Sequence, residues 1–261
     1  MEAAGGEYGE AMVAALELIW GEGFLSPGGP EEVAAILAGR DIRGARVLDI
    51  GCGIGGIDLL LAERFGAAKV VGIDVEGENI ERARRRAAQK GLAGRVSYRR
   101  VEPGPLPFPA ASFDVVFSKD AIIHVPDKES LFAEAFRLLE PGGRLMASDW
   151  LRRDDGPPSP EMERYIAAEG LSFAMASAER YRRALEAAGF RQVETRDRNA
   201  WYAARAREEL AALSGPLRGR LFELVGEAEA ERQILVWRRM LVVLETGELR
   251  PTHLYGEKPA P

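Results

Sequence analysis

Short apolar runs alternate with amphipathic segments from residue 45 to about residue 150. The runs have the length of buried strands, and the segments between them have the spacing of helices that bury one face. The predicted strands are 47–50, 70–74, 96–100, 113–117 and 144–148, and the predicted helices are 55–65, 77–90 and 131–139. This alternation indicates a parallel sheet with right-handed helical crossovers. Pro141-Gly142-Gly143 cannot extend a helix, so we expect a break ahead of the fifth strand.

The flanking segments follow another pattern. Residues 11–20 have helical spacing, with Met12, Leu16 and Ile19 on one side. After a loop at 154–160, the pattern predicts helices at 161–168, 178–188 and between 203 and 245, and strands at 190–195 and 252–256.

At 261 residues the chain is long for one domain and short for two. We therefore expect a single structural domain in three parts. These are a helical arm at residues 1–44, a core at 45–150, and a cap that also completes the sheet at 151–261.

Composition and charge narrow the class of protein. The formal net charge is −6 with no extended basic block, which argues against nucleic acid as the main partner. Cys52 is the only cysteine, so neither an intramolecular disulfide nor a cysteine metal cluster is possible. No apolar run approaches the roughly 20 residues of a membrane span, and the acidic N-terminus does not resemble a signal peptide. We expect a cytoplasmic monomer or homodimer without a metal site.

The strand at 47–50 leads into a glycine-dense turn, Gly51-Cys52-Gly53-Ile54-Gly55-Gly56. Glycine lets a backbone turn sharply and lie against a ligand where a Cβ would clash. Dinucleotide-binding loops space their glycines as G-x-G-x-x-G, whereas this turn reads G-x-G-x-G-G and follows Asp49. Asp49 would repel a pyrophosphate but attract the ammonium and cationic sulfur of S-adenosylmethionine. The pattern resembles that of the Rossmann-like methyltransferases.

Ligands of open α/β sheets lie beyond the carboxyl ends of the strands, so residues that follow each strand are candidates. Asp74 closes the second strand, where a carboxylate can accept hydrogen bonds from ribose hydroxyls. Glu102 follows the third strand and could accept a hydrogen bond from an adenine amino group or simply face solvent. Trp150 ends the fifth strand, and we expect it at the same pocket.

The segment after the fourth strand reads Ser118-Lys119-Asp120-Ala121-Ile122-Ile123-His124. If it is helical, Asp120 and His124 lie one turn apart on one face. Methyl transfer to an amine requires a free nitrogen lone pair, so a group must accept a proton near neutral pH, and imidazole has a suitable pKa. Asp120 could anchor an ammonium or hold the histidine tautomer.

Over residues 7 to 150 the chain resembles the phosphoethanolamine N-methyltransferase family. The segment 19–29, with Tyr8 upstream, is similar to that family's lid, I-F-G-E-x-Y-I-S-S-G-G, and the segment 118–124 is similar to its S-R-D-A-I-L-H. The resemblance implies a Rossmann-like class I methyltransferase fold. Its features are a mostly parallel seven-stranded sheet with helices on both faces, an N-terminal lid, and a cap inserted after the fifth strand.

The same resemblance implies S-adenosylmethionine as cofactor, S-adenosylhomocysteine as product, and the nitrogen of a small amine as methyl acceptor. It implies that Tyr8 and His124 form the catalytic pair and that Asp120 contacts the amine. The residues expected to bind the cofactor are Asp49, Gly51, Gly53, Asp74, Val75, Glu102 and Lys119. Glu102 replaces the family's aspartate and Lys119 its arginine, so both charges are kept.

The C-terminal half departs from the family, whose members hold the phosphate with tyrosines, an arginine and a lysine. Trp150 replaces a tyrosine, Tyr165 is kept, and Glu169 stands where the arginine is expected. An acid there would repel a phosphate dianion. Trp150 and Tyr165 could offer aromatic faces to a methylated ammonium, or could be core residues. The substrate stays open between a phosphoethanolamine-like amine and an unphosphorylated amine or amino acid.

Other functions are compatible with the same motifs. The acceptor could be oxygen, sulfur or carbon in a biosynthetic pathway, since the cofactor site would be unchanged. A cofactor-binding protein without catalysis and a hydride-transfer enzyme are the remaining alternatives.

Overall fold

The computed structural model describes residues 9–260. Its centre is a 7-stranded sheet in the order β3-β2-β1-β4-β5-β7-β6. The strands are β1 Arg46–Ile50, β2 Lys69–Asp74, β3 Val96–Arg100, β4 Phe113–Lys119, β5 Leu139–Arg152, β6 Arg191–Asp197 and β7 Leu249–Glu257. The pairs among β1 to β5 are parallel, and β7 runs antiparallel to both β5 and β6. The predicted sheet architecture is confirmed.

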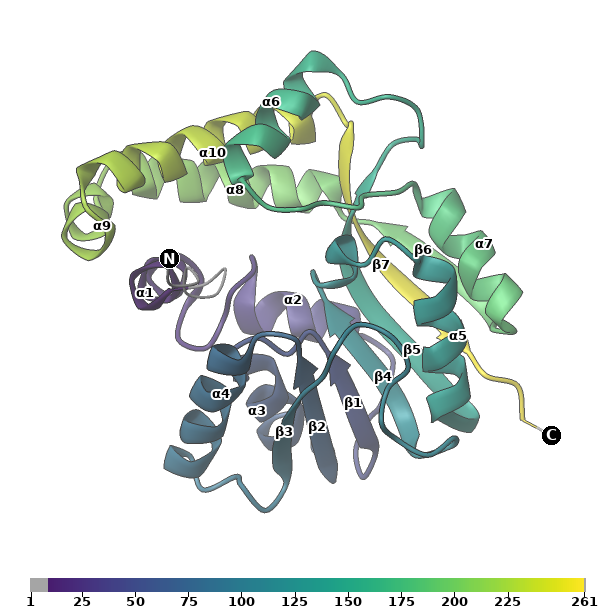
Figure 1. Cartoon of the computed structure of the whole chain (residues 1–261). Helices are drawn as coiled ribbons and strands as arrows, with labels where there is room; N and C mark the ends of the chain where they lie inside the picture. The colour runs from purple at the N-terminus through teal and green to yellow at the C-terminus, as the bar shows by residue number, and fades with distance from the viewer. Residues whose placement is uncertain (1–8, 261) are drawn as a thin grey trace.

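Helices cover both faces of the sheet, and a further helical layer lies beyond the carboxyl ends of its strands (Figure 1). The helices are α1 Glu10–Trp20, α2 Gly29–Ile36, α3 Gly56–Glu63, α4 Gly77–Gln89, α5 Lys128–Leu138, α6 Pro160–Glu169, α7 Ala178–Ala188, α8 Asn199–Ser214, α9 Arg218–Val225 and α10 Glu227–Glu245. Buried residues of α2, α3 and α4 form one core with the sheet, and those of α5 and α7 form another. A third core packs α1 of the arm against α6, α8, α9 and α10 of the cap.

One local prediction is wrong, and the condition under which Asp120 and His124 would share a helix face is not met. Pro141-Gly142-Gly143 does not break the chain ahead of the fifth strand but lies inside β5. The pairing of β4 with β5 shifts register there, and the Gly142 amide donates to the Lys258 carbonyl at 2.8 Å, so the ladder continues through a bulge. Asp120 does not belong to a helix either, because its φ is +58° and only a 3₁₀ turn, Ile122–His124, follows it.

A buried ionic cluster ties α2 to the last strand. Glu32 of α2 and His253 of β7 are fully buried, and the Glu32 carboxylate lies 2.6 Å from His253 Nε2. Arg198 contacts both Glu32 oxygens, at 3.1 and 2.6 Å. Burial raises the pKa of Glu32, but the hydrogen bonds from His253 and Arg198 outweigh it and lower the pKa to about 2. The arm is therefore fixed to the sheet at α2.

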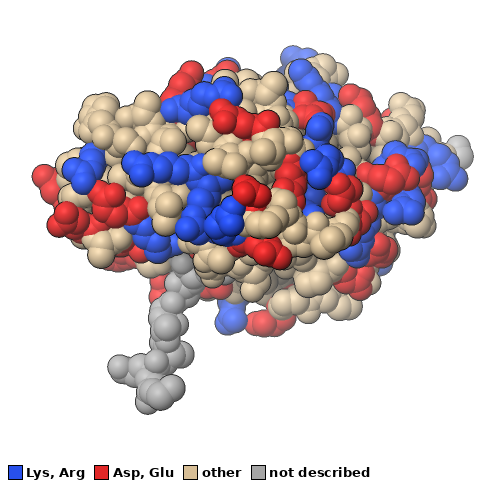
Figure 2. All heavy atoms as spheres, turned by 90° about the horizontal axis from the view of Figure 1, so that it is seen from above, with Lys and Arg blue, Asp and Glu red and all other residues tan. Residues whose placement is uncertain are grey.

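The cap presents a mixed surface. Seen from above, acidic and basic side chains are interspersed over this face, without a large patch of one sign (Figure 2). Charged side chains of the cap helices also pair with one another, for example Arg205 with Glu208 and Arg218 with Glu231. Among residues 9–260, no helix has both the length and the apolar character needed to cross a membrane.

Candidate active site

A cavity of about 460 Å³ lies at the carboxyl ends of β1, β2, β3 and β4, and we call it the core cavity. Most predicted cofactor residues line it, namely Gly51, Gly53, Asp74, Val75, Glu102 and Lys119. Because the four strands are parallel, their carboxyl ends lie at the same edge of the sheet, and the residues that follow them lie close together. The sequence prediction therefore brings together residues that are far apart along the chain.

The glycine turn shapes the floor of the core cavity. Gly51 has a φ of +77°, and a Cβ there would lie 2.2 Å from the Ala121 Cβ. The Asp74 carboxylate accepts hydrogen bonds from the Gly53 amide at 2.8 Å and the Glu76 amide at 2.9 Å. The turn is thus held against the end of β2, with the Asp74 side chain at the cavity wall.

Asp49 lies behind the glycine turn and does not line the core cavity. It is almost fully buried, and neither carboxylate oxygen finds a hydrogen-bond partner among the described residues; the same holds for Asp58 of α3. Burial and the nearby Asp74 raise the pKa of Asp49 to about 8, and burial together with Asp49 raises the pKa of Asp58. A direct contact between Asp49 and a cofactor therefore stays a prediction.

Glu102 sits at the rim of the core cavity. Its side chain is 77% exposed and lies 3.1 Å from Arg100. This position at the rim is compatible with a hydrogen bond from an adenine amino group to Glu102 and also with a side chain that only faces solvent. Val75 is 47% exposed and adds apolar surface to the cavity wall.

The loop between α1 and α2, residues 21–28, closes over the core cavity. Lys119 Nζ donates to Ser26 Oγ at 2.7 Å and to Asp120 at 2.5 Å. The Gly23 backbone packs against Gly56, where a Cβ would lie 2.3 Å from the Gly23 carbonyl oxygen. The resemblance to a lid thus corresponds to a segment that covers the glycine turn, while Tyr8 lies outside the described residues.

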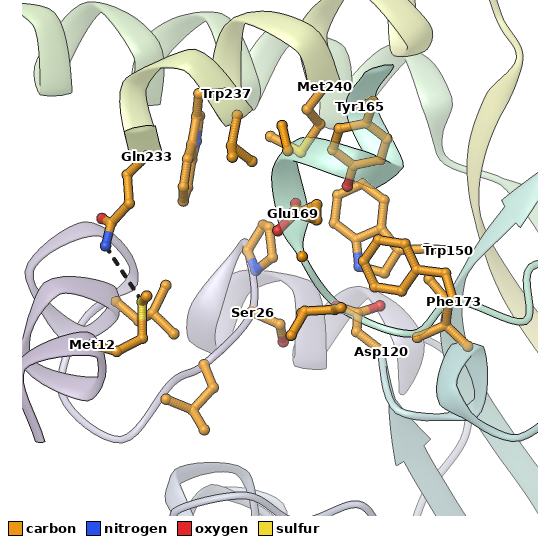
Figure 3. A pocket seen from close by; sticks show the side chains of 18 of the residues that line it. Met12, Ser26, Asp120, Trp150, Tyr165, Glu169, Phe173, Gln233, Trp237 and Met240 are labelled. Carbon is orange, nitrogen blue, oxygen red and sulfur yellow. Dashed lines mark hydrogen bonds between the residues drawn. The ribbon is translucent and has the colours of Figure 1, made fainter. Parts of the chain in front are cut away.

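A second cavity, of about 550 Å³, lies under the cap, and we call it the cap cavity (Figure 3). Its aromatic wall residues are Trp20, Trp150, Tyr165, Phe173 and Trp237. Met12, Val236 and Met240 add further apolar surface. Trp150, Tyr165 and Glu169, predicted as substrate residues, all line this cavity, so the structure places them together.

The two cavities meet at four residues that line both, Leu25, Ser26, Asp120 and His124. The Asp120 side chain is only 3% exposed, and it accepts hydrogen bonds from Lys119 and, at 3.2 Å, from Ser148 Oγ. The left-handed backbone of Asp120 turns the chain sharply at the end of β4. Asp120 and His124 are thus brought to one junction by this turn and not by a shared helix face.

One ring nitrogen of His124 is held by a hydrogen bond to the backbone. Its Nδ1 lies 3.1 Å from the Ser172 carbonyl oxygen, which can only accept, so Nδ1 carries the hydrogen. In the neutral ring Nε2 is then left with its lone pair. The ring also contacts Phe173, with 5.7 Å between centroids. His124 therefore holds the tautomer that can accept a proton on Nε2.

The turn that carries His124 is anchored from behind. Asp149 accepts a hydrogen bond from the Ile123 amide at 3.1 Å, and Lys128 Nζ donates to the Ile122 and Val125 carbonyls, each at 2.5 Å. Burial raises the pKa of Asp149 to about 7 and lowers that of Lys128 to about 8. These buried groups hold the backbone on both sides of His124.

Sequence reasoning missed the α10 wall of the cap cavity. Trp237 and Met240 come from α10, more than a hundred residues from the motifs. Glu209 of α8 was missed as well. Its carboxylate accepts from the indole nitrogens of Trp20 and Trp237, both at 3.0 Å. The only available signal was the helical spacing between 203 and 245, which does not say what the helices face.

Comparisons with known proteins agree with this arrangement. A family described as "Methyltransferase domain" matches residues 42–189. Phosphoethanolamine N-methyltransferase 1 of Arabidopsis thaliana is 36% identical over 74% of this chain and 38% of its own length. Phosphoethanolamine N-methyltransferase of Triticum aestivum is 32% identical over 97% of this chain and 49% of its own length. This chain thus spans half or less of these relatives.

A solved structure extends the likeness to the cap. Phosphoethanolamine N-methyltransferase 2 of Haemonchus contortus, in complex with phosphomonomethylethanolamine and S-adenosylhomocysteine, superposes with a TM-score of 0.88 at 27% identity. The match covers 97% of this chain and 59% of that one. The resemblance inferred from the motifs is confirmed, and the chain belongs to the methyltransferase domain family.

Proposed function

We propose that the protein transfers the methyl group of S-adenosylmethionine to the nitrogen of a small amine. The observation that carries this proposal is the junction between the core cavity and the cap cavity, where Asp120 and His124 line both. A methyl donor in the first cavity and an amine in the second would face each other there. The related N-methyltransferases of Arabidopsis thaliana and Haemonchus contortus support the choice of nitrogen as acceptor.

The lining of the core cavity supports S-adenosylmethionine as its ligand. The backbone at Gly51 and Gly53 offers close approach without side chains, and Asp74 presents a carboxylate beside it. We propose that Asp74 binds the ribose hydroxyls and that Val75 and Glu102 flank the adenine. Lys119 would act indirectly, because its ammonium is already bound to Ser26 and Asp120 and so holds the α1–α2 loop closed.

When bound, the cofactor supplies an electrophilic methyl group on a cationic sulfur. A nitrogen lone pair placed at the junction would form the new bond to that carbon, and the sulfur would keep the electrons of the breaking bond. His124 accepts a proton of the incoming ammonium at Nε2, since Nδ1 is held by Ser172. Asp120 orients the ammonium by charge, and Lys119 and Ser148 fix its carboxylate.

Positioning supplies most of the rate enhancement in this proposal. Holding acceptor and methyl in attack geometry is worth on the order of 7 to 11 kcal/mol. The arm at residues 1–44 would act as a lid that excludes water, and Tyr8 would complete the catalytic pair with His124. The arm is already tied to the core by Arg86, which contacts Glu17 of α1 at 2.7 Å.

An assay with methyl-labelled S-adenosylmethionine tests the proposal. The purified protein is incubated with a panel of phosphorylated and unphosphorylated amines, and products are identified by mass spectrometry and by the NMR shift of the labelled methyl. We expect N-methyl products and one S-adenosylhomocysteine per methyl. If the labelled methyl were found on oxygen, sulfur or carbon, the protein would be a methyltransferase for another acceptor atom. Tight cofactor binding without any turnover would favour a binding protein without catalysis.

A further inference from the structure

The cap cavity has the walls of a site for an apolar molecule. Its volume of about 550 Å³ falls inside the range of roughly 300 to 1,000 Å³ that accommodates drug-sized ligands. Aromatic rings follow one another along one side, with 5.7 Å between His124 and Phe173 and 6.3 Å between Phe173 and Tyr165. Trp20 and Trp237 form another aromatic pair at 5.6 Å. A substrate of a few polar atoms would leave most of this surface uncovered.

The charged groups that face the cap cavity are mainly acids. Glu169 and Asp120 line it, and Figure 3 shows Glu169 among the aromatic side chains, with Asp120 on the side of the junction. The Tyr165 hydroxyl hydrogen-bonds to Glu169. Burial raises the pKa of Glu169, while that hydrogen bond and Arg232 act in the opposite direction. A cation beside Glu169 would favour its ionised form further.

The cations near the cap cavity already have partners. Arg232 is the only lysine or arginine among the described residues that line it. Its guanidinium makes a forked contact with Glu229, at 2.8 and 2.6 Å, and donates to the Ala168 carbonyl at 2.8 Å. The indole N–H groups of Trp20 and Trp237 both point to Glu209. Few free donors remain for a phosphate, which needs several charge-assisted hydrogen bonds.

We propose that the methyl acceptor is an unphosphorylated amine with an apolar or aromatic body, bound through its ammonium by Glu169 and Asp120. This inference rests on the proposed function and specifies its substrate class. The aromatic rings stabilise the ammonium by cation–π attraction and cover the apolar body. A phosphate dianion in the same cavity would face Glu169 and Asp120, of which Asp120 is already paired with Lys119. It would find no unpaired lysine or arginine among the described residues that line the cavity.

The experiment compares three acceptors that differ in the group attached to the amine: 2-phenylethylamine, ethanolamine and phosphoethanolamine. Steady-state rates are followed through S-adenosylhomocysteine release, and cofactor affinity is measured separately by calorimetry. We expect kcat/KM for 2-phenylethylamine to exceed that for phosphoethanolamine by about tenfold or more, the ratio given by one well-placed charged contact.

Two variants on the same helix separate a site role from a general charge effect. Glu169→Gln keeps the shape of the side chain and removes its charge, while the control Glu163→Gln changes an exposed acid of α6 outside the cavity. Glu169→Gln should raise the KM for 2-phenylethylamine by about tenfold and leave cofactor affinity unchanged. The control should stay within about twofold of the parent protein.

Each remaining outcome decides a different question. A preference for phosphoethanolamine, or a KM for 2-phenylethylamine that Glu169→Gln does not change, overturns the substrate class while the proposed function stands. Cofactor binding without methylation of any amine in the panel overturns the proposed function itself, and the inference with it. Cofactor affinity lost in Glu169→Gln would show that the side chain supports the fold and not the amine.

Discussion

The core cavity is shaped by backbone, whereas the cap cavity is shaped by side chains. The core cavity takes most of its wall from loops that directly follow β1, β2, β3 and β4, with glycines where the chain approaches the ligand space. The cap cavity takes much of its wall from α1, α6 and α10, which lie far apart along the sequence. A backbone site depends on a short motif, so it persists while side chains elsewhere change. A side-chain site can be rebuilt for another acceptor without touching the first.

The largest expected effect concerns the junction that both cavities share. His124→Ala removes the free Nε2, and we expect turnover to fall by about 10² to 10⁴, the usual contribution of a general base. Cofactor affinity should change little, because the core cavity keeps its glycine turn and Asp74. Rapid-quench turnover and calorimetry measure the two quantities, and added imidazole should restore part of the rate. Unchanged turnover would remove His124 from the mechanism.

The next effect concerns the joint between the arm and the sheet. The lowered pKa of Glu32, about 2 against an ordinary 4.5, stabilises the fold above pH 4.5, and this stabilisation is lost as pH falls from 4.5 towards 2. Glu32→Gln should lower the free energy of unfolding by about 3 kcal/mol at neutral pH. It should also weaken the pH dependence of this free energy between pH 4.5 and about 2.

Denaturant unfolding at a series of pH values measures this difference. Glu31→Gln on the same helix is the control, since Glu31 is 66% exposed and pairs only with Arg205 in the described structure. If both variants lost the same free energy, the buried cluster would not be what holds α2 to β7.

A smaller effect should separate the core cavity from the cap cavity. Gly51→Ala places a Cβ 2.2 Å from Ala121 in a left-handed conformation, so we expect cofactor affinity to fall by about tenfold or more. Gly91→Ala is the matched control, because its φ of +70° gives similar backbone strain while no atom lies within 4 Å of the added Cβ.

The clash in Gly51→Ala can also be relieved. Adding Ala121→Gly to this variant removes the opposing Cβ and should restore much of the cofactor affinity. Calorimetric titration with S-adenosylhomocysteine provides the measurement. Equal affinities for the single and the double variant would mean that backbone strain, and not the close approach of these loops, sets the effect.

The smallest effect concerns the cap cavity alone. Glu209→Gln leaves one acceptor for two indole N–H groups, so Trp20 and Trp237 lose one of their shared contacts. We expect the KM for the amine to rise by roughly threefold to tenfold, with cofactor affinity unchanged. Glu208→Gln, an exposed neighbour on α8, is the control. A change in cofactor affinity without a change in KM would contradict the division into two cavities.

The core was largely predictable because its signals are local. The strand at 96–100 matches β3, and the strands at 47–50 and 70–74 fall within one residue of β1 and β2. Gly51, Gly53 and Asp74 line the core cavity as expected, because a glycine turn and a carboxylate that directly follow buried strands lie at the carboxyl ends of the sheet. The contact between Arg86 of α4 and Glu17 of α1 could not be predicted, because a charged residue on a helix gives no sign of its partner in a distant segment.

The sequence by itself determined the α/β core, the glycine turn and the presence of Asp120 and His124 after the fourth strand. Hydrophobic periodicity and glycine spacing act over a few residues and can be followed along the chain. Only the tertiary structure decided that the left-handed Asp120 brings these groups to a junction, that Ser172 orders the His124 tautomer, and that Trp237 faces Trp20. Such contacts join segments that are distant along the chain; Trp20 and Trp237, for example, meet because α1 and α10 pack into one core.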